Sequence, residues 1–286
     1  MHKAVKKQKS KNRVGAFAPV LASRFKTGKL DGETAPEAEL TQLKRGRVTF
    51  YIIGKTPLIM NRMSQKVIQG LLLPSGPKTK AEKQGSTKHN PLEEFRASAH
   101  LMRDPEAPTL LGMPATAFKG ALRDVAVDIP GAAKAQIGRL TYIEDEYVPI
   151  YGVPQLVMSV VRNSDMNRTP DVRTRLIVPR WAAVVTILFQ IPLLTGKQVR
   201  DLFAAAGEII GVGDFRPQKG RGNYGQFILT TPEAIEPIMA DGGREEQEKA
   251  MKDPGFYDID SEELFAWYQE EMERRGRAKK EGEDKK

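Results

Sequence analysis

The sequence predicts an α+β fold with a ferredoxin-like (RRM-like) βαββαβ core. Three observations lead to this prediction. Short stretches alternate apolar and polar residues as strands do, and longer stretches repeat apolar residues at helical spacing. With the insertions between them set aside, these elements follow the order strand, helix, strands, helix, strand, which is the ferredoxin-like order. The 286 residues suffice for one or two domains with a sizeable core.

The first half of this core begins with a strand at residues 47–53, which Gly54 ends. Alternate positions along this strand are apolar. A helix is expected to begin at Pro114, because apolar residues then recur at helical spacing. These residues are Phe118, Leu122 and Val125. Residues 139–143 and 147–150 each have the composition of a short strand, so we expect them to pair as a hairpin.

The second half contains the longest apolar run, residues 181–191, which predicts a buried strand with Trp181 in the core. Thr195 and Gln198 form a capping box that starts the second helix. Its apolar face consists of Val199, Leu202, Phe203, Ala206 and Ile210. A glycine-rich turn then leads into a last strand at residues 225–230.

Charge and composition divide the chain into three parts. Residues 1–45 form a basic arm that we expect to be flexible, because its first 13 residues carry six Lys and Arg and no acid. Residues 46–232 hold the predicted elements and form the folded domain. Residues 233–286 are an acidic tail, since residues 241–286 hold 15 Asp and Glu against 10 Lys and Arg. One helix, at residues 261–275, is expected in this tail.

Composition also excludes several classes of protein. The chain has no cysteine, so disulfides, thiolate metal sites and a cysteine nucleophile are excluded. Its three histidines lack the spacing of a metal pair, and no Walker A or dinucleotide-binding fingerprint occurs in the required context. We therefore expect no metal and no cofactor. No run of ~18 apolar residues predicts a membrane span, and the lack of cysteine fits a cytoplasmic location.

The net charge of +9 points to a polyanionic partner. The richest candidate for its binding site is the stretch at residues 211–225, in which five glycines let the backbone approach a ligand closely. Arg216, Lys219 and Arg221 add charge, and Tyr224 adds a face on which a base can stack. This combination favours binding of a single strand through its backbone.

Two further basic features support the same partner. Lys119 and Arg123 lie at i and i+4 on the helix that begins at Pro114, and an anion bridging them would relieve their repulsion. Residues 152–178 form a basic segment of less regular pattern. Its arginines are Arg162, Arg168, Arg173 and Arg175.

Three motifs resemble those of the RAMP superfamily of CRISPR proteins. Residues 54–61, Gly-Lys-Thr-Pro-Leu-Ile-Met-Asn, follow the first strand and look like the family's G-x-(S/T)-P-L turn. Residues 112–123, Gly-Met-Pro-Ala-Thr-Ala-Phe-Lys-Gly-Ala-Leu-Arg, are similar to its I-P-G-S-S-x-K-G-A-L-R helix start. The glycine-rich turn into residues 224–227 resembles the loop before the family's final strand. The motifs occur in family order within residues 46–230.

This resemblance implies the backbone subunit of CRISPR effector complexes, of the seventh Cas family, or a phage-borne relative. Such a subunit would form a homo-oligomer or filament along a single strand, RNA being favoured over DNA, beside other effector subunits in antiviral defence. Residues 152–178 would be its thumb and residues 75–90 a finger insertion. The residues expected to bind nucleic acid are Asn61, Arg62, Lys119, Arg123, Arg162, Arg168, Arg173, Arg175, Arg216, Lys219, Arg221 and Tyr224.

The resemblance also argues against catalysis. Family members that cut RNA use an aspartate in the loop after the first strand, whereas no Asp or Glu lies between Gly54 and Glu82. We therefore expect a non-catalytic binding protein. Two alternatives remain open: a phage structural or assembly protein that keeps the fold without the ligand, and a metal-dependent nuclease built on scattered aspartates. Those aspartates are Asp124, Asp128, Asp165, Asp171 and Asp214.

Overall fold

The computed structural model describes residues 42–73, 89–162, 170–219 and 221–274. Of these, residues 43–274 belong to one compact unit. The predicted arm at residues 1–45 and the predicted finger at residues 75–90 therefore lie almost entirely outside the described part. Within it, helices and an antiparallel sheet are mixed, as the sequence predicted.

The main sheet has six strands with β1 near its middle. β1 pairs antiparallel with β8 on one side and with β9 on the other. In sheet order the strands are β3 (Gly112–Pro114), β5 (Tyr147–Tyr151), β8 (Ala182–Ile191), β1 (Lys44–Gly54) and β9 (Phe227–Thr230), with β4 (Thr141–Ile143) also on β8. The strands predicted at residues 47–53, 181–191 and 225–230 are thus confirmed.

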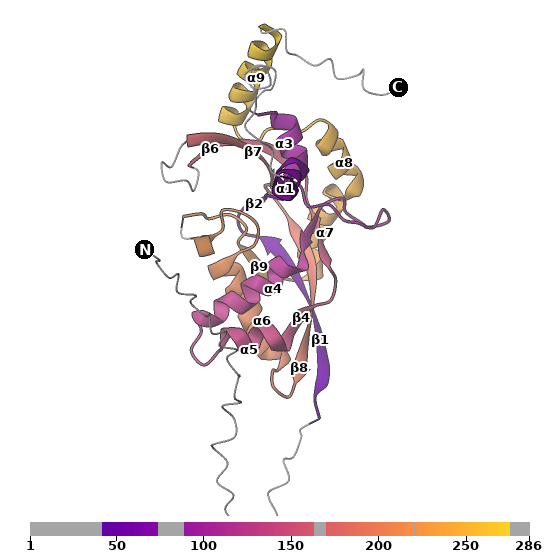
Figure 1. The fold of residues 1–286 in the computed structure, drawn as a ribbon. Helices are drawn as coiled ribbons and strands as arrows, with labels where there is room; N and C mark the ends of the chain where they lie inside the picture. The colour runs from indigo at the N-terminus through magenta and orange to yellow at the C-terminus, as the bar shows by residue number, and fades with distance from the viewer. Residues whose placement is uncertain (1–41, 74–88, 163–169, 220, 275–286) are drawn as a thin grey trace, which may run out of the picture. The chain divides into compact units, whose positions relative to one another are not determined.

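Two helices lie on one face of this sheet (Figure 1). A cluster of buried aromatic rings joins them to it. They are α4 (Ala115–Asp124) and α6 (Gly196–Ala205), the latter with the predicted capping box at Thr195. The ring of Phe227 on β9 lies 6.1 Å from that of Phe118 on α4 and 5.1 Å from that of Phe203 on α6. Burying such rings contributes about 2 kcal/mol each or more. This cluster fixes both helices relative to the last strand.

The hairpin predicted at residues 139–150 is wrong. Residues Lys134–Leu140 form helix α5, and β4 and β5 do not pair with each other. Both pair instead with β8, β4 opposite Ile187–Phe189 and β5 opposite Ala182–Ala183. The long strand β8 offers one edge on which both short strands bury an isoleucine, namely Ile143 and Ile150.

A second sheet of three strands carries the basic segment. It consists of β2 (Leu58–Met60), β7 (Pro170–Val178) and β6 (Gln155–Arg162), all antiparallel. The segment 152–178, whose pattern looked irregular, is therefore mostly a regular hairpin, with Val157 opposite Arg175. Arg173 and Arg175, two residues apart, lie on the same face of β7.

Shorter elements connect these layers. They are α1 (Gln65–Leu72), α3 (Pro91–Ser98), the 3₁₀ turns η1 (Val125–Val127) and η3 (Pro217–Lys219), and η2 (Ala206–Ile210), a π-helical turn that continues α6. Trp181 is fully buried, as predicted, and its indole Nε1 donates to the carbonyl of Thr56 at 2.9 Å. None of the helices in the described ranges is long and apolar enough to cross a membrane.

The acidic C-terminal region departs most from its predicted form. Three helices replace the single expected one: α7 (Pro232–Asp241), α8 (Arg244–Lys252) and α9 (Ile259–Arg274), of which the last matches the expectation. Gln247 of α8 is fully buried. Its amide oxygen accepts from the backbone N–H groups of Leu110 and Leu111, and its amide nitrogen donates to the carbonyls of Ile150 and Gly152. Helix α8 is therefore an integral part of the body.

Candidate nucleic-acid interface

The glycine-rich segment 211–225 (the Gly loop below) docks on the turn that follows β1. The backbone N–H of Asp214 donates to the carbonyl of Ile59 at 2.9 Å, and that of Gly225 donates to Pro57 at 2.8 Å. Both contacts need glycine. A Cβ on Gly225, whose φ is +72°, would lie 1.7 Å from the Val212 carbonyl oxygen, and one on Gly213 would lie 2.6 Å from that of Ile59. The glycines thus permit close docking of the loop.

Asp214 ties the Gly loop to the second sheet. Its Oδ2 accepts from Asn61 Nδ2, just after β2, at 3.0 Å. The same oxygen lies 3.0 Å from Nη1 of Arg175 on β7. Burial lowers the pKa of the Arg175 guanidinium, the Asp214 carboxylate opposes this and the nearby Arg173 adds to it; an arginine stays charged regardless. Two predicted binding residues therefore meet at one carboxylate.

Asp124 ties the Gly loop to the helical layer in a similar way. Its Oδ1 lies 2.9 Å from Arg123 Nη2 and 2.9 Å from Lys134 Nζ on α5, and its Oδ2 accepts from Nε2 of Gln218 in the loop. Burial acts to raise the pKa of Asp124, but the hydrogen bonds from Lys134, Arg123 and Gln218 outweigh it, so the pKa is lowered. The carboxylate therefore remains charged and holds two cations.

Arg216 links these two carboxylate centres along the loop. Its Nη1 donates to the Gly213 carbonyl at 2.8 Å, next to Asp214, and its Nε donates to Gln218 Oε1 at 2.9 Å. Gln218 in turn reaches Asp124. A continuous polar network thus runs from β2 and β7 through the loop to α4 and α5, with three cations bound to two carboxylates and Arg216 between them. Its members are Asn61, Arg175, Asp214, Arg216, Gln218, Asp124, Arg123 and Lys134.

Aromatic side chains accompany the loop. Tyr224 is half-buried and packs against the small cluster of Ile59, Val157 and Ile177 between the loop and the second sheet. Phe215, with a positive φ of 54°, lies with its ring 6.3 Å from that of Tyr224 and is 45% exposed. Tyr224 is thus mostly a packing residue, and Phe215 presents the more accessible aromatic face.

Lys119 and Arg123 do not act as a pair. Lys119 Nζ lies 5.8 Å from the ring centroid of Tyr142 on β4, whereas Arg123 turns to Asp124. Each cation thus has a partner of its own, and the repulsion that sequence reasoning attributed to them is already relieved. Only Arg123 joins the polar network.

The remaining predicted residues lie around the network without joining it. Arg62 is exposed next to Asn61, and Lys219 and Arg221 are exposed in the Gly loop. Arg173 is exposed on β7 with its Nε 3.8 Å from Asp171, and Arg162 is exposed at the end of β6. Arg168 lies outside the described residues.

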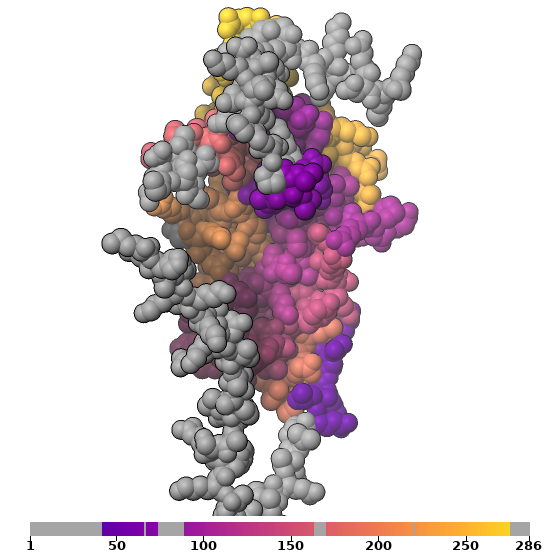
Figure 2. All heavy atoms as spheres, in the orientation of Figure 1, coloured from indigo at the N-terminus to yellow at the C-terminus, as the bar shows by residue number. Residues whose placement is uncertain are grey.

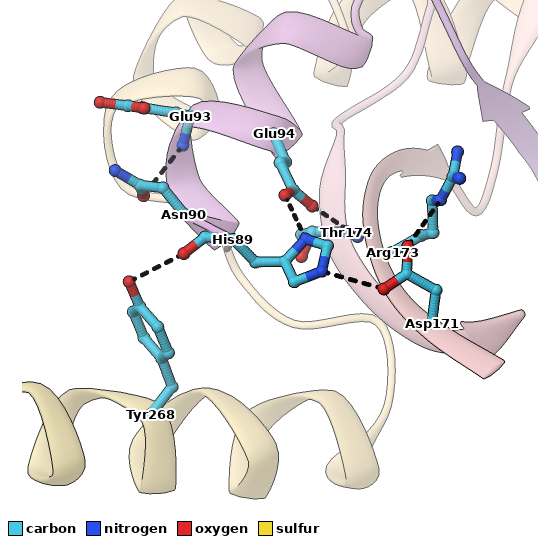
Figure 3. Close-up of polar contacts among 8 residues, drawn as sticks. All are labelled: His89, Asn90, Glu93, Glu94, Asp171, Arg173, Thr174 and Tyr268. Atoms are coloured by element: carbon cyan, nitrogen blue, oxygen red, sulfur yellow. Dashed lines mark hydrogen bonds and ion pairs between the residues drawn. The ribbon is translucent and has the colours of Figure 1, made fainter. Parts of the chain in front are cut away.

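Figure 3 shows a polar clasp that holds the β6–β7 hairpin to helices α3 and α9. His89, before α3, has its Nδ1 2.7 Å from Glu94 Oε1 and its Nε2 3.1 Å from Asp171 Oδ1 on β7. Glu94 also accepts from the backbone N–H of Thr174, and the Tyr268 hydroxyl of α9 donates to the carbonyl of His89. His89 is half-buried and anchors the hairpin.

The aspartates considered for a nuclease do not gather. Asp124 and Asp214 each bind cations, Asp171 faces His89, and Asp128 is exposed. Across the described ranges, no group of three or more His, Asp or Glu side chains is placed to hold a metal ion. Asp165 lies outside those ranges.

No protein-family model matches the chain, and no curated protein matches it. Among solved structures, one similar chain comes from the type III-B Cmr-beta bound to cognate target RNA, with 15% identity over 66% of this chain and a TM-score of 0.36. A second such structure is Cmr6 from Pyrococcus furiosus, with 11% identity over 65% of this chain and 98% of Cmr6, and a TM-score of 0.34.

The chain spans 60% of the length of the Cmr-beta chain. At TM-scores below 0.5, neither likeness carries a function over to this chain.

Sequence reasoning missed several residues of the network. Lys134 and Gln218 carry no local motif, and Asp214 was weighed only as a metal ligand. Phe215 did carry a signal, because it lies between two charged residues inside the glycine-rich stretch. An aromatic residue beside cations in such a stretch is typical of single-strand binding.

Proposed function

We propose that this protein binds single-stranded nucleic acid through its phosphate backbone, with RNA favoured over DNA. The observation that carries the proposal is the polar network along the Gly loop, which joins the second sheet to helices α4 and α5. Three cations bind its two carboxylates and Arg216 lies between them, while Arg173 on β7 and Lys219 and Arg221 in the Gly loop are exposed. An excess of fixed positive charge on a continuous surface attracts a polyanion and contacts phosphates without reading bases.

We propose that the protein is not an enzyme. Asp124 and Asp214 are engaged by arginine and lysine, so binding a metal would first require breaking those ion pairs. Incubation with Mg²⁺ or Mn²⁺ and a labelled single strand tests this proposal. We expect intact strand at all times; accumulation of cleaved product that is lost when Asp124 or Asp214 is changed to Asn would favour the nuclease alternative.

We also propose that the core is ferredoxin-like, as in RAMP proteins. The strand order β9, β1, β8 and then β5, with α4 and α6 on one face, supports this assignment. The hairpin of β6 and β7 would then correspond to the thumb. In this proposal the chain is a CRISPR-associated subunit, or a phage-borne relative, located in the cytoplasm.

Helix α1 supports assembly with other subunits. Leu71, Leu72 and Leu73 at its end are largely exposed, with Leu72 at 74%. Figure 2 shows this helix standing at the molecular surface in dark violet. Adjacent exposed leucines are typical of a surface that another protein covers. We propose a homo-oligomer or filament along the strand, and electron microscopy with and without a single strand of 40 nucleotides would detect it.

A salt titration tests the binding proposal directly. Affinity for a labelled 40-nucleotide single strand should fall linearly with salt on logarithmic axes, because phosphate contacts release counterions. Changing Arg173, Lys219 and Arg221 to alanine should reduce the magnitude of that slope by about 2, at ~0.7 per lost contact.

The matched control removes three cations at the far end of β1, namely Lys44, Arg45 and Lys197. Arg45 lies nine residues from the Gly54 end where the loop docks, about 30 Å along the strand. This control should keep the wild-type slope. Equal slopes for both triple variants would show that the Gly loop is not part of the interface. A wild-type protein that binds no strand even at low salt would favour the structural or assembly alternative.

A further inference from the structure

The contact between Arg175 and Asp214 has the form of an anion site filled by the protein itself. Two donors meet at one carboxylate oxygen: Asn61 Nδ2 and Arg175 Nη1 each lie 3.0 Å from Asp214 Oδ2. The arginine and aspartate side chains are only 14% and 27% exposed. Asn61 and Arg175 come from two strands of the second sheet, whereas Asp214 comes from the Gly loop. The two donors therefore belong to a rigid surface, and the acceptor belongs to a loop.

Arg175 has more capacity to donate than Asp214 uses. Its Nε is buried and has no acceptor among the residues that the structure describes. An arginine binds carboxylates and phosphates most favourably through two parallel hydrogen bonds. Here Asp214 is engaged by one terminal nitrogen, and a buried donor left unpaired costs free energy. An anion that presents one oxygen to Nη1 and a second oxygen to Nε would use both donors of Arg175.

The surroundings favour an anion other than Asp214. Arg173 lies two residues away from Arg175 on the same face of β7, so positive charge gathers there. The backbone on each side of Asp214 has positive φ, with Gly213 at +83° and Phe215 at +54°. Such conformations are costly for residues other than glycine, so the loop can shift the carboxylate away at a reduced energetic cost.

We propose that Asn61 and Arg175 form a phosphodiester-binding site whose resident ligand is the Asp214 carboxylate, and that a backbone phosphate of the bound strand displaces it. The proposal rests on the function proposed above and adds to it a defined subsite and an internal competitor. A displaceable carboxylate weakens binding of isolated anions, because each must first break the internal ion pair. A strand with many phosphates overcomes this barrier through its other contacts.

The test compares wild type with Asp214→Asn, which keeps an oxygen for both donors and removes the charge. The probe is a labelled 40-nucleotide poly(U) RNA, titrated at several salt concentrations. Asp214→Asn should bind about three- to tenfold more tightly, and its salt slope should steepen by ~0.7, because the charge of Arg175 no longer has an internal partner. Asp128→Asn is the matched control: Asp128 is exposed, carries the same charge and lies outside the network, so it should show neither change.

Each outcome decides the proposal. Unchanged or weaker binding by Asp214→Asn, while wild type binds, overturns this inference and leaves the proposed function intact. A gain of equal size in Asp128→Asn assigns the effect to general charge and also overturns it. If neither the wild type nor any variant binds the RNA, the proposed function is overturned as well. Asp214→Ser serves as a second variant; if both variants unfold by circular dichroism, the carboxylate is a structural requirement and no ligand can displace it.

Discussion

The polar network along the Gly loop ends at two carboxylates, and these are held with different rigidity. At one end, Asp124 lies within helix α4 and accepts from Arg123, Lys134 and Gln218. At the other end, Asp214 lies in the loop itself and accepts from one cation and one amide. Donors from three segments surround the first carboxylate, whereas the second leaves part of its arginine unsatisfied. The ion pairs of Asp124 therefore fix the loop to the helices, whereas the ion pair of Asp214 with Arg175 is exchangeable.

The largest loss of stability is expected from a substitution that displaces the whole Gly loop and so disrupts the contacts at both carboxylates. Gly225→Ala places a Cβ 1.7 Å from the Val212 carbonyl oxygen at a φ of +72°, so the loop must leave its docking position. We expect a loss of about 3 kcal/mol or more in the free energy of unfolding, measured with urea. Gly131→Ala is the matched control, because Gly131 has a φ of +82° with open space around it. It should cost about 1 kcal/mol; equal losses would show that steric contact at Gly225 is unimportant.

The next effect separates the two ends. Arg175→Ala leaves Asp214 partly buried without its cation, and we expect a loss of about 3 kcal/mol in the free energy of unfolding. Arg123→Ala should cost only about 0.5 kcal/mol, because Arg123 is more exposed and Lys134 still neutralises Asp124. Urea unfolding of both variants gives the comparison. If Arg123→Ala is the more destabilising change, Lys134 does not compensate for the loss of Arg123 at Asp124.

The smallest effect depends on pH. The pKa of Asp124 is lowered in the folded protein, so its contribution is complete above the unfolded pKa, about 4, and is lost as the pH falls through the folded value. Wild type should therefore exceed Asp124→Asn by about 1 kcal/mol at pH 7 and by progressively less below pH ~4. Urea unfolding across this range measures the difference. A difference that stays constant down to the lowest pH at which the protein folds would contradict a charged Asp124.

Residue patterns predicted the elements whose burial is local. Alternation along β1 and the capping box at Thr195 were sufficient, because each depends on neighbours in the sequence. The pairing of β4 and β5 was missed because both bind the distant strand β8. Helix α8 was missed because its sequence, Arg-Glu-Glu-Gln-Glu-Lys-Ala-Met-Lys, has no apolar stripe, and its burial depends on hydrogen bonds of Gln247.

The same distinction between local and long-range contacts applies to the candidate interface. The glycine and cation content of residues 211–225 singled out the loop, and Arg175 and Asn61 were named from the sequence. Their meeting at Asp214 was not predictable, since the contact joins residues 153 positions apart.

Gln247 has a consequence for how the protein is made. Gln247 hydrogen-bonds backbone groups that lie 95 to 137 positions earlier in the sequence and are therefore synthesised well before it. They belong to Leu110, Leu111, Ile150 and Gly152. Until residue 247 has left the ribosome, Gln247 cannot supply these hydrogen bonds, and the same backbone groups depend on water. The early part of the nascent chain therefore completes its hydrogen bonding only when a late segment arrives.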